Sequence, residues 1–452
     1  MDFDEALRYL LSLGHETVAI KLGLNNTERL LDELGRPQDS FPSVQIAGTN
    51  GKGSTAVVLD SIARAAGIKT GLYTSPHLIS ITERMRTDGV EITERDFARL
   101  ITMVRDAAHR LLDRKELSSL PTFFEHVTVA ALVAFREMGI ELAILETGLG
   151  GRLDSTTAAG ARIVALTPIA LDHQEYLGQT LAEIAAEKAA IIRPGVTAAI
   201  VAPQPVEAME VILRRCAENN VAPRFVHDSL KVMGADHSGR LRVRIKSSNN
   251  CYEGVLAGLR GRHQLTNVAT AFALSEALRE NGFNIPREAV IKGIETAEHK
   301  GRLEIWEGKP SLLFDGAHNT AGAQALRDYL DEFVTVPITF VFGAMRDKAL
   351  EEIAATLFPA ASGLIFTQAT NPRSATPEEI ARAAVAAAAT TSGIDSSRIT
   401  LVPSPAEALK IARAETPSHG VILITGSLYL VGEIMHTIQR QGNASLLTNS
   451  DN

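Results

Sequence analysis

Cysteine is nearly absent from this sequence, and it has neither long apolar runs nor a basic excess. The two cysteines, Cys216 and Cys251, exclude a disulfide-dense secreted scaffold. No uninterrupted apolar run reaches the roughly 18 to 20 residues of a membrane span. The acidic start, residues 1–5, lacks the basic region and apolar core of a signal peptide. We therefore expect a cytoplasmic protein with reduced thiols and no membrane partner.

Aromatic residues make up only 5% of the chain, with Trp306 as the sole tryptophan. The core is therefore expected to consist mainly of alanine, leucine, isoleucine and valine. The 45 basic residues are outnumbered by 53 acidic ones, and the net charge of −8 argues against nucleic acid as the main partner. At roughly 150 residues per domain, the 452 residues predict about three domains, although two large ones also fit.

The first part of the chain has the pattern of an α/β domain. A short β-type run at residues 44–47 precedes a glycine-rich turn and a predicted helix over residues 55–66, which ends at Gly67. Strand, glycine loop and helix in this order open a nucleotide-binding βαβ unit. Nearly continuous apolar runs predict a parallel sheet covered on both faces, at residues 142–145, 163–166 and 198–201.

The later part of the chain restarts this alternation after an interruption. Residues 240–245 alternate polar and apolar side chains, which favours a half-exposed antiparallel excursion. Five later apolar runs predict a second, doubly wound α/β domain, at residues 312–314, 338–342, 364–366, 399–402 and 421–424. Because Gly301 lies near the seam, we predict a domain boundary at about residue 298.

The strongest local signal is the loop Gly48-Thr-Asn-Gly-Lys-Gly-Ser-Thr55. Glycines let a backbone approach phosphates closely, and amides at a helix N-terminus bind anions. Lys52 could then reach the β- and γ-phosphates of a nucleotide, and Ser54 or Thr55 could face a magnesium ion. The standard pattern has Ser or Thr directly after the lysine, whereas Gly53 intervenes here. The alternative is an ordinary glycine and asparagine turn, which needs no lysine.

Polar clusters follow several predicted strands. Glu146 ends one strand, Asp172-His173 follows the next, and Asp315-Gly-Ala-His-Asn319 follows a C-terminal one. Ligands of open α/β sheets bind at the carboxyl ends of the strands. A glutamate, a histidine and the hydroxyl of Ser75 could share one magnesium ion, although carboxylates and water are its commoner partners. Taken singly, the glutamate could be a structural ion-pair partner, and such histidines more often lie in the surface or the core.

Lys188 lies in the run Glu187-Lys-Ala-Ala-Ile-Ile-Arg-Pro-Gly195. Basic residues followed by proline and glycine are typical of the end of a helix. From the residues alone, this helix-end interpretation is favoured over a role in a site.

Together these segments resemble the Mur ligase superfamily, specifically its folate branch of folylpolyglutamate and dihydrofolate synthases. The resemblance covers nearly the whole chain, and the extra glycine at Gly53 is typical of this branch. It implies a phosphate-loop-type ATPase domain with a mostly parallel sheet over residues 1–297 and a smaller Rossmann-like glutamate-ligase domain over residues 298–452. The matching motifs appear in family order: residues 48–54, Thr74-Ser-Pro-His-Leu78, Glu83-Arg84, Thr122-Phe-Phe-Glu125, residues 146–154, Asp172-His173, Gly261-Arg-His-Gln264 with Asn267, Gly301-Arg302 and Asp315-Gly-Ala-His-Asn319.

The resemblance implies a ligase that uses ATP and Mg²⁺. ATP phosphorylates a substrate carboxylate to an acyl phosphate, and the amino group of L-glutamate attacks it, leaving an amide, ADP and phosphate. The implied metal ligands are Ser75, Glu146 and His173. The implied ATP contacts are Gly51, Lys52, Gly53 and Ser54 on the triphosphate, Asn267 on the adenine, Arg302 on the phosphates and Asp315 on the ribose. Because the last two lie beyond the seam, ATP is expected to be clamped between the domains.

The catalytic residues that the resemblance implies are Lys52, Lys188 and His318. Lys188 matches a lysine that this family carbamylates, which would turn a cation into a carboxylate able to approach the metal. This implication overrides the helix-end interpretation. His318 is expected near the incoming glutamate, and Arg373 resembles the arginine that binds the amino-acid carboxylate in other Mur ligases.

The resemblance places a pteroate pocket at two segments, Thr122, Phe123, Phe124 and Glu125, and Leu153, Asp154 and Ser155. Phenylalanines can stack on a pterin ring, but core packing of Phe123 and Phe124 is the alternative. After Asp154 the folate branch usually continues Ala/Ser-Thr-Asn, whereas this chain has Ser155-Thr156-Thr157. This departure alters the loop without touching an implied metal ligand.

We therefore expect a monomeric, bifunctional ligase that adds glutamate first to dihydropteroate and later to reduced folates. An enzyme with one of these activities is the nearest alternative. A Mur ligase acting on a UDP-linked muramoyl precursor is disfavoured by the folate-type loop and by the lack of a separate UDP-binding domain before it. A catalytically silent nucleotide-binding regulator is disfavoured because Lys52, Glu146, His173 and Lys188 are all present.

Overall fold

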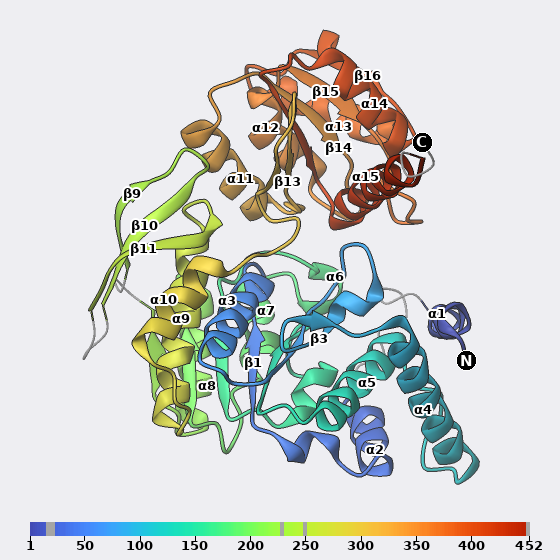
Figure 1. Cartoon of the computed structure of the whole chain (residues 1–452), viewed down its shortest axis with the longest axis vertical. Coiled ribbons are helices and arrows are strands. Elements are labelled where there is room, and N and C mark those ends of the chain that lie inside the picture. The colour runs from blue at the N-terminus through green and yellow to red at the C-terminus, as the bar shows by residue number, and fades with distance from the viewer. Residues whose placement is uncertain (15–22, 227–229, 247–250, 449–452) are drawn as a thin grey trace.

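The computed structural model describes the chain except for residues 15–22, 227–229, 247–250 and 449–452. The chain forms a larger α/β unit, blue to yellow in Figure 1, and a smaller one, orange to red, that lies above it. The described residues contain an eight-stranded, a three-stranded and a six-stranded sheet. The predicted α/β class, with a large parallel-rich sheet and a second α/β unit, is confirmed.

The larger unit is built around the eight-stranded sheet, in the order β4-β3-β2-β5-β1-β6-β7-β8. The strands from β2 through β8 in this order are parallel, and β3 and β4 pair antiparallel at one edge. The central strands are buried on both faces, which explains their continuous apolar runs. The bounds are β1 (Ser43–Ala47), β2 (Thr70–Tyr73), β3 (Met85–Thr87), β4 (Val90–Glu91), β5 (Leu142–Glu146), β6 (Ile163–Leu166), β7 (Ala198–Val201) and β8 (Pro223–Phe225).

Helices cover both faces of this sheet. Apolar side chains of α3, α9 and α10 form one core with the strands. A second core contains α4 and α5, and a third contains α7 and α8. The predicted helix after the glycine loop is confirmed, although α3 begins at Lys52 rather than Thr55. The helices are α1 (Phe3–Ser12), α2 (Asn25–Glu33), α3 (Lys52–Ala65), α4 (Glu94–Asp113), α5 (Phe123–Met138), α6 (Gln174–Leu177), α7 (Leu181–Ala189), α8 (Val206–Glu218), α9 (Gln264–Glu280) and α10 (Arg287–Thr296).

The predicted antiparallel excursion is the three-stranded sheet β9 (Leu230–Ala235), β10 (Arg240–Lys246) and β11 (Cys251–Arg260). Alternate residues of β10 are buried in the core shared with α9 and α10, and the arginines between them are not. Half-burial therefore explains the alternation of polar and apolar residues.

The smaller unit contains a six-stranded sheet in the order β12-β13-β17-β14-β15-β16. All five predicted strands are confirmed, as β13 (Ser311–Phe314), β14 (Ile338–Phe342), β15 (Gly363–Phe366), β16 (Ile399–Leu401) and β17 (Val421–Thr425). The sequence did not predict β12 (Glu304–Trp306), because this antiparallel edge strand is only three residues long and starts with a charged residue. The helices are α11 (Thr320–Phe333), α12 (Leu350–Leu357), α13 (Pro377–Ala388), α14 (Pro405–Glu415) and α15 (Leu428–Thr448).

The seam between the two units runs through the segment that joins α10 to β12. We keep the division at residues 297 and 298 as a proposal, since it falls between the end of α10 at Thr296 and the start of β12 at Glu304. Leu303, within this segment, is fully buried and has a left-handed backbone with φ 47°. The units also touch elsewhere, because Leu78 and Ile79 of the larger unit pack against the apolar cluster under α14 and α15.

Candidate active site

The glycine loop joins β1 to α3 and presents the N-terminus of that helix. Gly51 caps α3 in a left-handed conformation with φ 88°, which favours glycine. A Cβ atom on Gly51 would lie 2.1 Å from Oδ1 of Asn267, so α9 and the loop approach too closely for any side chain. Lys52 folds back and its Nζ donates to the carbonyl oxygens of Gly48 and Thr49, each at 3.2 Å. The free amides of α3 are suited to an anion.

Gly53, the departure from the standard phosphate-loop pattern, has a steric reason in this structure. A Cβ atom there would lie 3.0 Å from Cε1 of His299 and 3.2 Å from Oε2 of Glu146. The missing side chain lets both groups close in on the loop. The next residue, Ser54, shares a hydrogen bond of 3.1 Å between its Oγ and Nδ1 of His299.

Two of the predicted metal ligands come from neighbouring strands. Glu146 ends β5 and Ser75 follows β2, which pairs directly with β5. The backbone N–H of Ser75 donates to Oε2 of Glu146 at 3.1 Å. Burial raises the pKa of Glu146, and the positive charges of Lys52, Arg302 and Arg84 partly offset this rise.

His173 follows β6 and starts the short helix α6. Its backbone is left-handed, with φ 50°. Burial lowers the pKa of His173 to about 4, so its imidazole is neutral at pH 7 and can act as a ligand. Among the described residues, no three His, Cys, Asp or Glu side chains converge as a metal cluster. A buried carboxylate, a neutral imidazole and a hydroxyl nevertheless form a donor set that fits a divalent cation.

Lys188 points into the protein rather than into solvent. Its side chain is buried near the end of α7, and Nζ donates to the carbonyl oxygen of Gly48 at 2.8 Å. Burial, reinforced by the charge of Lys52, lowers the pKa of Lys188 to about 7. The helix does end at Ala189, but the interpretation of Lys188 as an ordinary helix-end lysine is wrong, because its amine lies against the phosphate loop.

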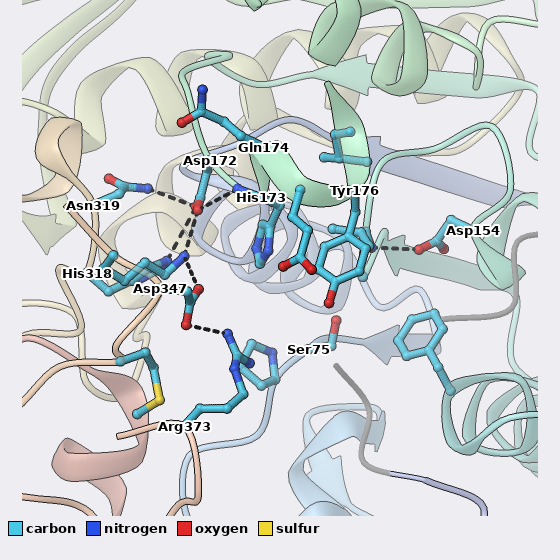
Figure 2. A pocket seen from close by; sticks show the side chains of 18 of the residues that line it. Ser75, Asp154, Asp172, His173, Gln174, Tyr176, His318, Asn319, Asp347 and Arg373 are labelled. Carbon is cyan, nitrogen blue, oxygen red and sulfur yellow. Dashed lines mark hydrogen bonds and ion pairs between the residues drawn. The ribbon is translucent and has the colours of Figure 1, made fainter. Parts of the chain in front are cut away.

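A cavity with a volume of about 470 Å³ is lined by residues of both units (Figure 2). It brings together every residue of the predicted pteroate pocket with His318 and Arg373. Two of the predicted metal ligands also face it, while Glu146 and the phosphate loop lie outside its lining. The predicted site residues in its wall are Ser75, Thr122, Phe123, Phe124, Glu125, Leu153, Asp154, Ser155, His173, His318 and Arg373.

The four residues at the start of α5 have different surroundings. Thr122 and Glu125 form a capping box, in which Oγ1 of Thr122 accepts from the amide of Glu125 at 3.3 Å and Oε2 of Glu125 accepts from that of Thr122 at 2.6 Å. Phe123 is 5% exposed and belongs to the core, with the guanidinium of Arg84 5.5 Å above its ring. Phe124 is only partly buried. Core packing therefore describes Phe123, and Phe124 offers the more accessible aromatic surface.

Asp154 organises a second loop that lines the pocket. It caps the 3₁₀ helix at Ser155–Ala159, and its carboxylate accepts from the amides of Thr156 at 3.0 Å and Leu149 at 2.9 Å. Burial raises its pKa against these hydrogen bonds. Thr157, where the folate branch usually has asparagine, donates to the carbonyl of Gly151 at 2.7 Å. The substituted position is thus satisfied within the loop.

Three predicted ATP contacts lie outside the large cavity, around the seam. The side chain of Asn267 faces Gly51, and its Nδ2 donates to Gln264 at 2.7 Å. Arg302 lines a second cavity of about 280 Å³ together with His299. The carboxylate of Asp315 accepts hydrogen bonds from the amides of Leu303 at 3.0 Å and Ala317 at 2.9 Å. It therefore also holds the segment between α10 and β12 in place.

The predicted site did not include a polar network that crosses between the units. In Figure 2, Asp172 lies where several hydrogen bonds and ion pairs meet. Nζ of Lys348 lies 2.7 Å from one of its oxygens, and Nδ2 of Asn319 lies 3.1 Å from the other. Burial would raise the pKa of Asp172, but the hydrogen bond from His318 and nearby positive charges hold it well below its usual range. Lys348 carried no sequence signal beyond its place after a strand.

Comparison with known proteins assigns this arrangement to a family. The Mur ligase middle domain matches residues 46–275, and the Mur ligase glutamate ligase domain matches residues 301–428. The dihydrofolate synthase/folylpolyglutamate synthase of Bacillus subtilis is 32% identical over 427 residues, which cover 93% of this chain and 96% of that protein. The chain belongs to the folylpolyglutamate and dihydrofolate synthase branch of the Mur ligases. It is therefore an ATP-dependent ligase.

Solved structures of this branch share the whole fold. Escherichia coli FolC in complex with DHPP and ADP is similar with a TM-score of 0.84 at 29% identity, covering 98% of each chain. The bifunctional synthase of Yersinia pestis, complexed with AMPPNP and Mn ion, is similar with a TM-score of 0.82 at 27% identity, covering 97% of this chain and 98% of that one. Among the described residues, no helix is long and apolar enough to cross a membrane.

Proposed function

We propose that this ligase is bifunctional and joins L-glutamate to dihydropteroate and to reduced folates. The observation that carries the proposal is that one cavity has Phe124 and Asp154 in one wall and His318 and Arg373 in the other. The first wall is complementary to an acceptor that carries an aromatic ring. The second wall is complementary to an amino acid with two carboxylates.

ATP is proposed to bind along the seam, with its triphosphate at Gly51, Lys52, Gly53 and Ser54. Asn267 is assigned to the adenine, Arg302 to the phosphates and Asp315 to the ribose. Lys52 would have to leave the carbonyls of Gly48 and Thr49 to reach a phosphate. Its ammonium then neutralises charge on the transferred phosphoryl group, which is the main task of a protein in this chemistry.

We assign the divalent cation to Ser75, Glu146 and His173. When bound, such a cation would neutralise negative charge on the phosphate groups. The raised pKa of Glu146 suits this assignment, because a buried carboxylate gains most from a positive partner. The Mn ion in the similar Yersinia pestis structure supports a divalent metal.

Lys188 is proposed to be carbamylated. Carbamylation joins carbon dioxide to a neutral amine and releases a proton, and the pKa of about 7 leaves much of Lys188 neutral at physiological pH. The resulting carboxylate would lie beside Gly48 and Lys52 and contribute negative charge close to the cation.

The second half of the reaction is proposed to occur at the wall formed by the smaller unit. The amine of glutamate attacks the acyl phosphate, an amide forms, and phosphate leaves. Arg373 is assigned to a glutamate carboxylate, which would compete with the present ion pair of 2.8 Å between Arg373 and Asp347. His318, whose Nδ1 lies 2.8 Å from the carbonyl of Gly316, is assigned to a position beside the amine.

The deciding experiment measures phosphate release from ATP with glutamate, and compares dihydropteroate with tetrahydrofolate as the acceptor. We expect release with both. Release with only one acceptor would reduce the proposal to a single activity, and release with neither would refute it. A Lys52→Met variant, in which the phosphate-loop amine is removed, serves as the inactive control.

We further infer a monomer that works in the cytoplasm without a nucleic-acid partner. In support, all proposed site residues come from one chain, and the net charge is −8. Light scattering coupled to size exclusion tests the oligomeric state. A stable dimer at micromolar concentration would contradict it.

A further inference from the structure

We propose that Asn50, Asp172, Asn319 and Lys348 form an interdomain latch, which holds His173 in place only while the smaller unit is docked. Asn319 and Lys348 are then positioning residues of the ligase reaction. The inference rests on the proposed function in one respect, namely the assignment of His173 to the cation. It goes beyond that function because it names residues that make site assembly depend on docking.

The first arm of the latch is a buried ion pair. Nζ of Lys348 lies 2.7 Å from Oδ1 of Asp172, and each side chain is only 8% exposed. The partners belong to different units, because Lys348 lies between β14 and α12 whereas Asp172 follows β6. Asp347 is a poorer partner for the lysine, at 3.9 Å. Separation of the units would break this ion pair and expose both charges to water.

The second arm uses an amide whose orientation is fixed. Asn319 caps α11, and its Oδ1 accepts from the amide of Gly322 at 2.8 Å. Its Nδ2 must therefore face the larger unit, where it donates to Oδ2 of Asp172 at 3.1 Å and to Oδ1 of Asn50 at 3.0 Å. Asn50 is part of the phosphate loop, so this arm reaches both the nucleotide side and the strand end that carries His173.

Asp172 passes this contact on to the neighbouring residue. Its Oδ1, the oxygen that faces Lys348, also accepts from the backbone amide of His173 at 2.9 Å. His173 has a left-handed φ of 50°, a conformation that a residue with a side chain adopts at a cost. The carboxylate held by the smaller unit therefore helps to stabilise the backbone that aims the imidazole. Such supporting contacts are worth about 10- to 100-fold in metal affinity or activity at metal sites.

The competing explanation is that Lys348 binds a carboxylate of the incoming glutamate directly, since it also lines the cavity. The two explanations differ for Asn319, which serves the latch through Asp172. Asn319→Ser retains an oxygen that can cap α11 but removes the donor to Asp172 and Asn50. Lys348→Met keeps the length of the side chain and removes its charge. Lys410→Met, at an exposed lysine of α14, is the matched control.

The test uses the full-length enzyme and measures kcat, the KM for each substrate and the Mg²⁺ concentration for half-maximal activity. We expect each latch variant to lower kcat and to raise the Mg²⁺ concentration for half-maximal activity. In each variant, kcat/KM should fall by about 10- to 100-fold. The double variant should be little worse than the more affected single variant, because both arms act through Asp172. Lys410→Met should match the wild type.

Two results would overturn the latch. One is an increase in the KM for glutamate alone in Lys348→Met, with Asn319→Ser unaffected. The other is wild-type behaviour of both latch variants.

Small-angle X-ray scattering without substrates provides a readout independent of activity. The radius of gyration should rise in both latch variants and stay unchanged in the control. Unchanged scattering in both latch variants would contradict the latch. If the wild type released no phosphate, the proposed function would fail while scattering would still decide the latch.

Discussion

Lys188 illustrates how the surroundings of a single residue set its chemistry. A lysine in water keeps its proton to about pH 10.5, whereas burial and the charge of Lys52 bring the pKa of Lys188 to about 7. The same amine that is inert on a surface is therefore partly neutral, and nucleophilic, at physiological pH. Its contact with the carbonyl of Gly48 holds it beside the phosphate loop.

This depressed pKa predicts a pH-dependent stability. The unfolded chain keeps the lysine proton up to about pH 10.5, but folded Lys188 releases it above about pH 7, so between these values the unfolded state binds more protons. The unfolding free energy of the wild type relative to Lys188→Met should therefore rise with pH across this window, by up to about 1.4 kcal/mol per pH unit. Denaturant titrations in buffers free of carbon dioxide measure it, and a flat difference would contradict the buried amine.

Carbamylation of the same lysine makes a separate prediction for activity. Lys188→Met should lose about 10- to 100-fold in kcat, because a negative group close to the cation is missing. Added bicarbonate should raise the activity of carbon-dioxide-depleted wild type and leave the variant unchanged. A wild type indifferent to bicarbonate, with no ¹³C signal after labelling, would argue for an unmodified lysine.

The adjacent phenylalanines of α5 offer a matched pair. Phe124→Leu should raise the KM for dihydropteroate by about 3- to 10-fold, the value of one aromatic contact, with little change in stability. Phe123→Leu should instead cost about 1 kcal/mol of stability, because its ring is in the core. Acceptor kinetics and thermal denaturation separate the two effects. Equal KM values for the two variants would remove Phe124 from the pteroate pocket.

At the level of elements, the junction of β1 and α3 depends on one left-handed glycine. Gly51→Ala places a Cβ atom 2.1 Å from Oδ1 of Asn267, besides the strain of φ 88°. Gly67→Ala is the control, since Gly67 has φ 79° but no atom of the described residues lies within 4 Å of an added Cβ. Gly67→Ala should lose roughly 1–2 kcal/mol of stability from the backbone strain alone. Gly51→Ala should lose more because of the added clash, and only this variant should raise the KM for ATP. Unchanged ATP kinetics in Gly51→Ala would contradict the phosphate loop.

Element prediction from the sequence succeeded where burial imposes a pattern. Four of the five predicted strands of the smaller unit are largely buried, and strands covered on both faces are almost entirely apolar. The fifth, β16, is a partly buried edge strand that was still recognised by its apolar residues. Edge strand β12 was not predicted, since it is short and begins with a charged residue. The start of α3 was placed at Thr55 rather than Lys52, because Gly53 reads as a turn residue and its packing against Glu146 and His299 is not visible in a sequence.

At the level of the whole molecule, the contacts between the units could not be predicted from local sequence patterns. Motif residues such as Glu146 and His173 could be predicted because they lie at or beyond the ends of strands, which meet at one edge of the sheet. Lys348 and Asp172 are separated by 176 positions, and only docking of the units brings their charges together. The seam residues Arg302 and Asp315 were predicted by resemblance, but the hydrogen bond that the amide of Leu303 donates to Asp315 was not.

A nucleotide that bridges the seam should stabilise the whole molecule. With Mg²⁺ and AMPPNP at 100 times the dissociation constant, the wild type should gain about 2.7 kcal/mol. Arg302→Ala should bind more weakly and gain less at the same concentration, since a hydrogen bond to a charged group is worth about 1.5–3 kcal/mol. Arg413→Ala, at an exposed position of α14, should gain as much as the wild type. Equal gains in all three proteins would place Arg302 outside the nucleotide site.

The shared cavity has a consequence for how a polyglutamate chain grows. The wall proposed for the pterin belongs to the larger unit and the wall proposed for the amino acid contains residues of the smaller one, so the span between them is set by the fold. Each added glutamate moves the terminal carboxylate further from the ring, yet that carboxylate must return to the same phosphate loop. A ring seated at Phe124 for the first addition cannot stay there for the second. We therefore expect the folate to bind anew, in a shifted position, before each further glutamate is added.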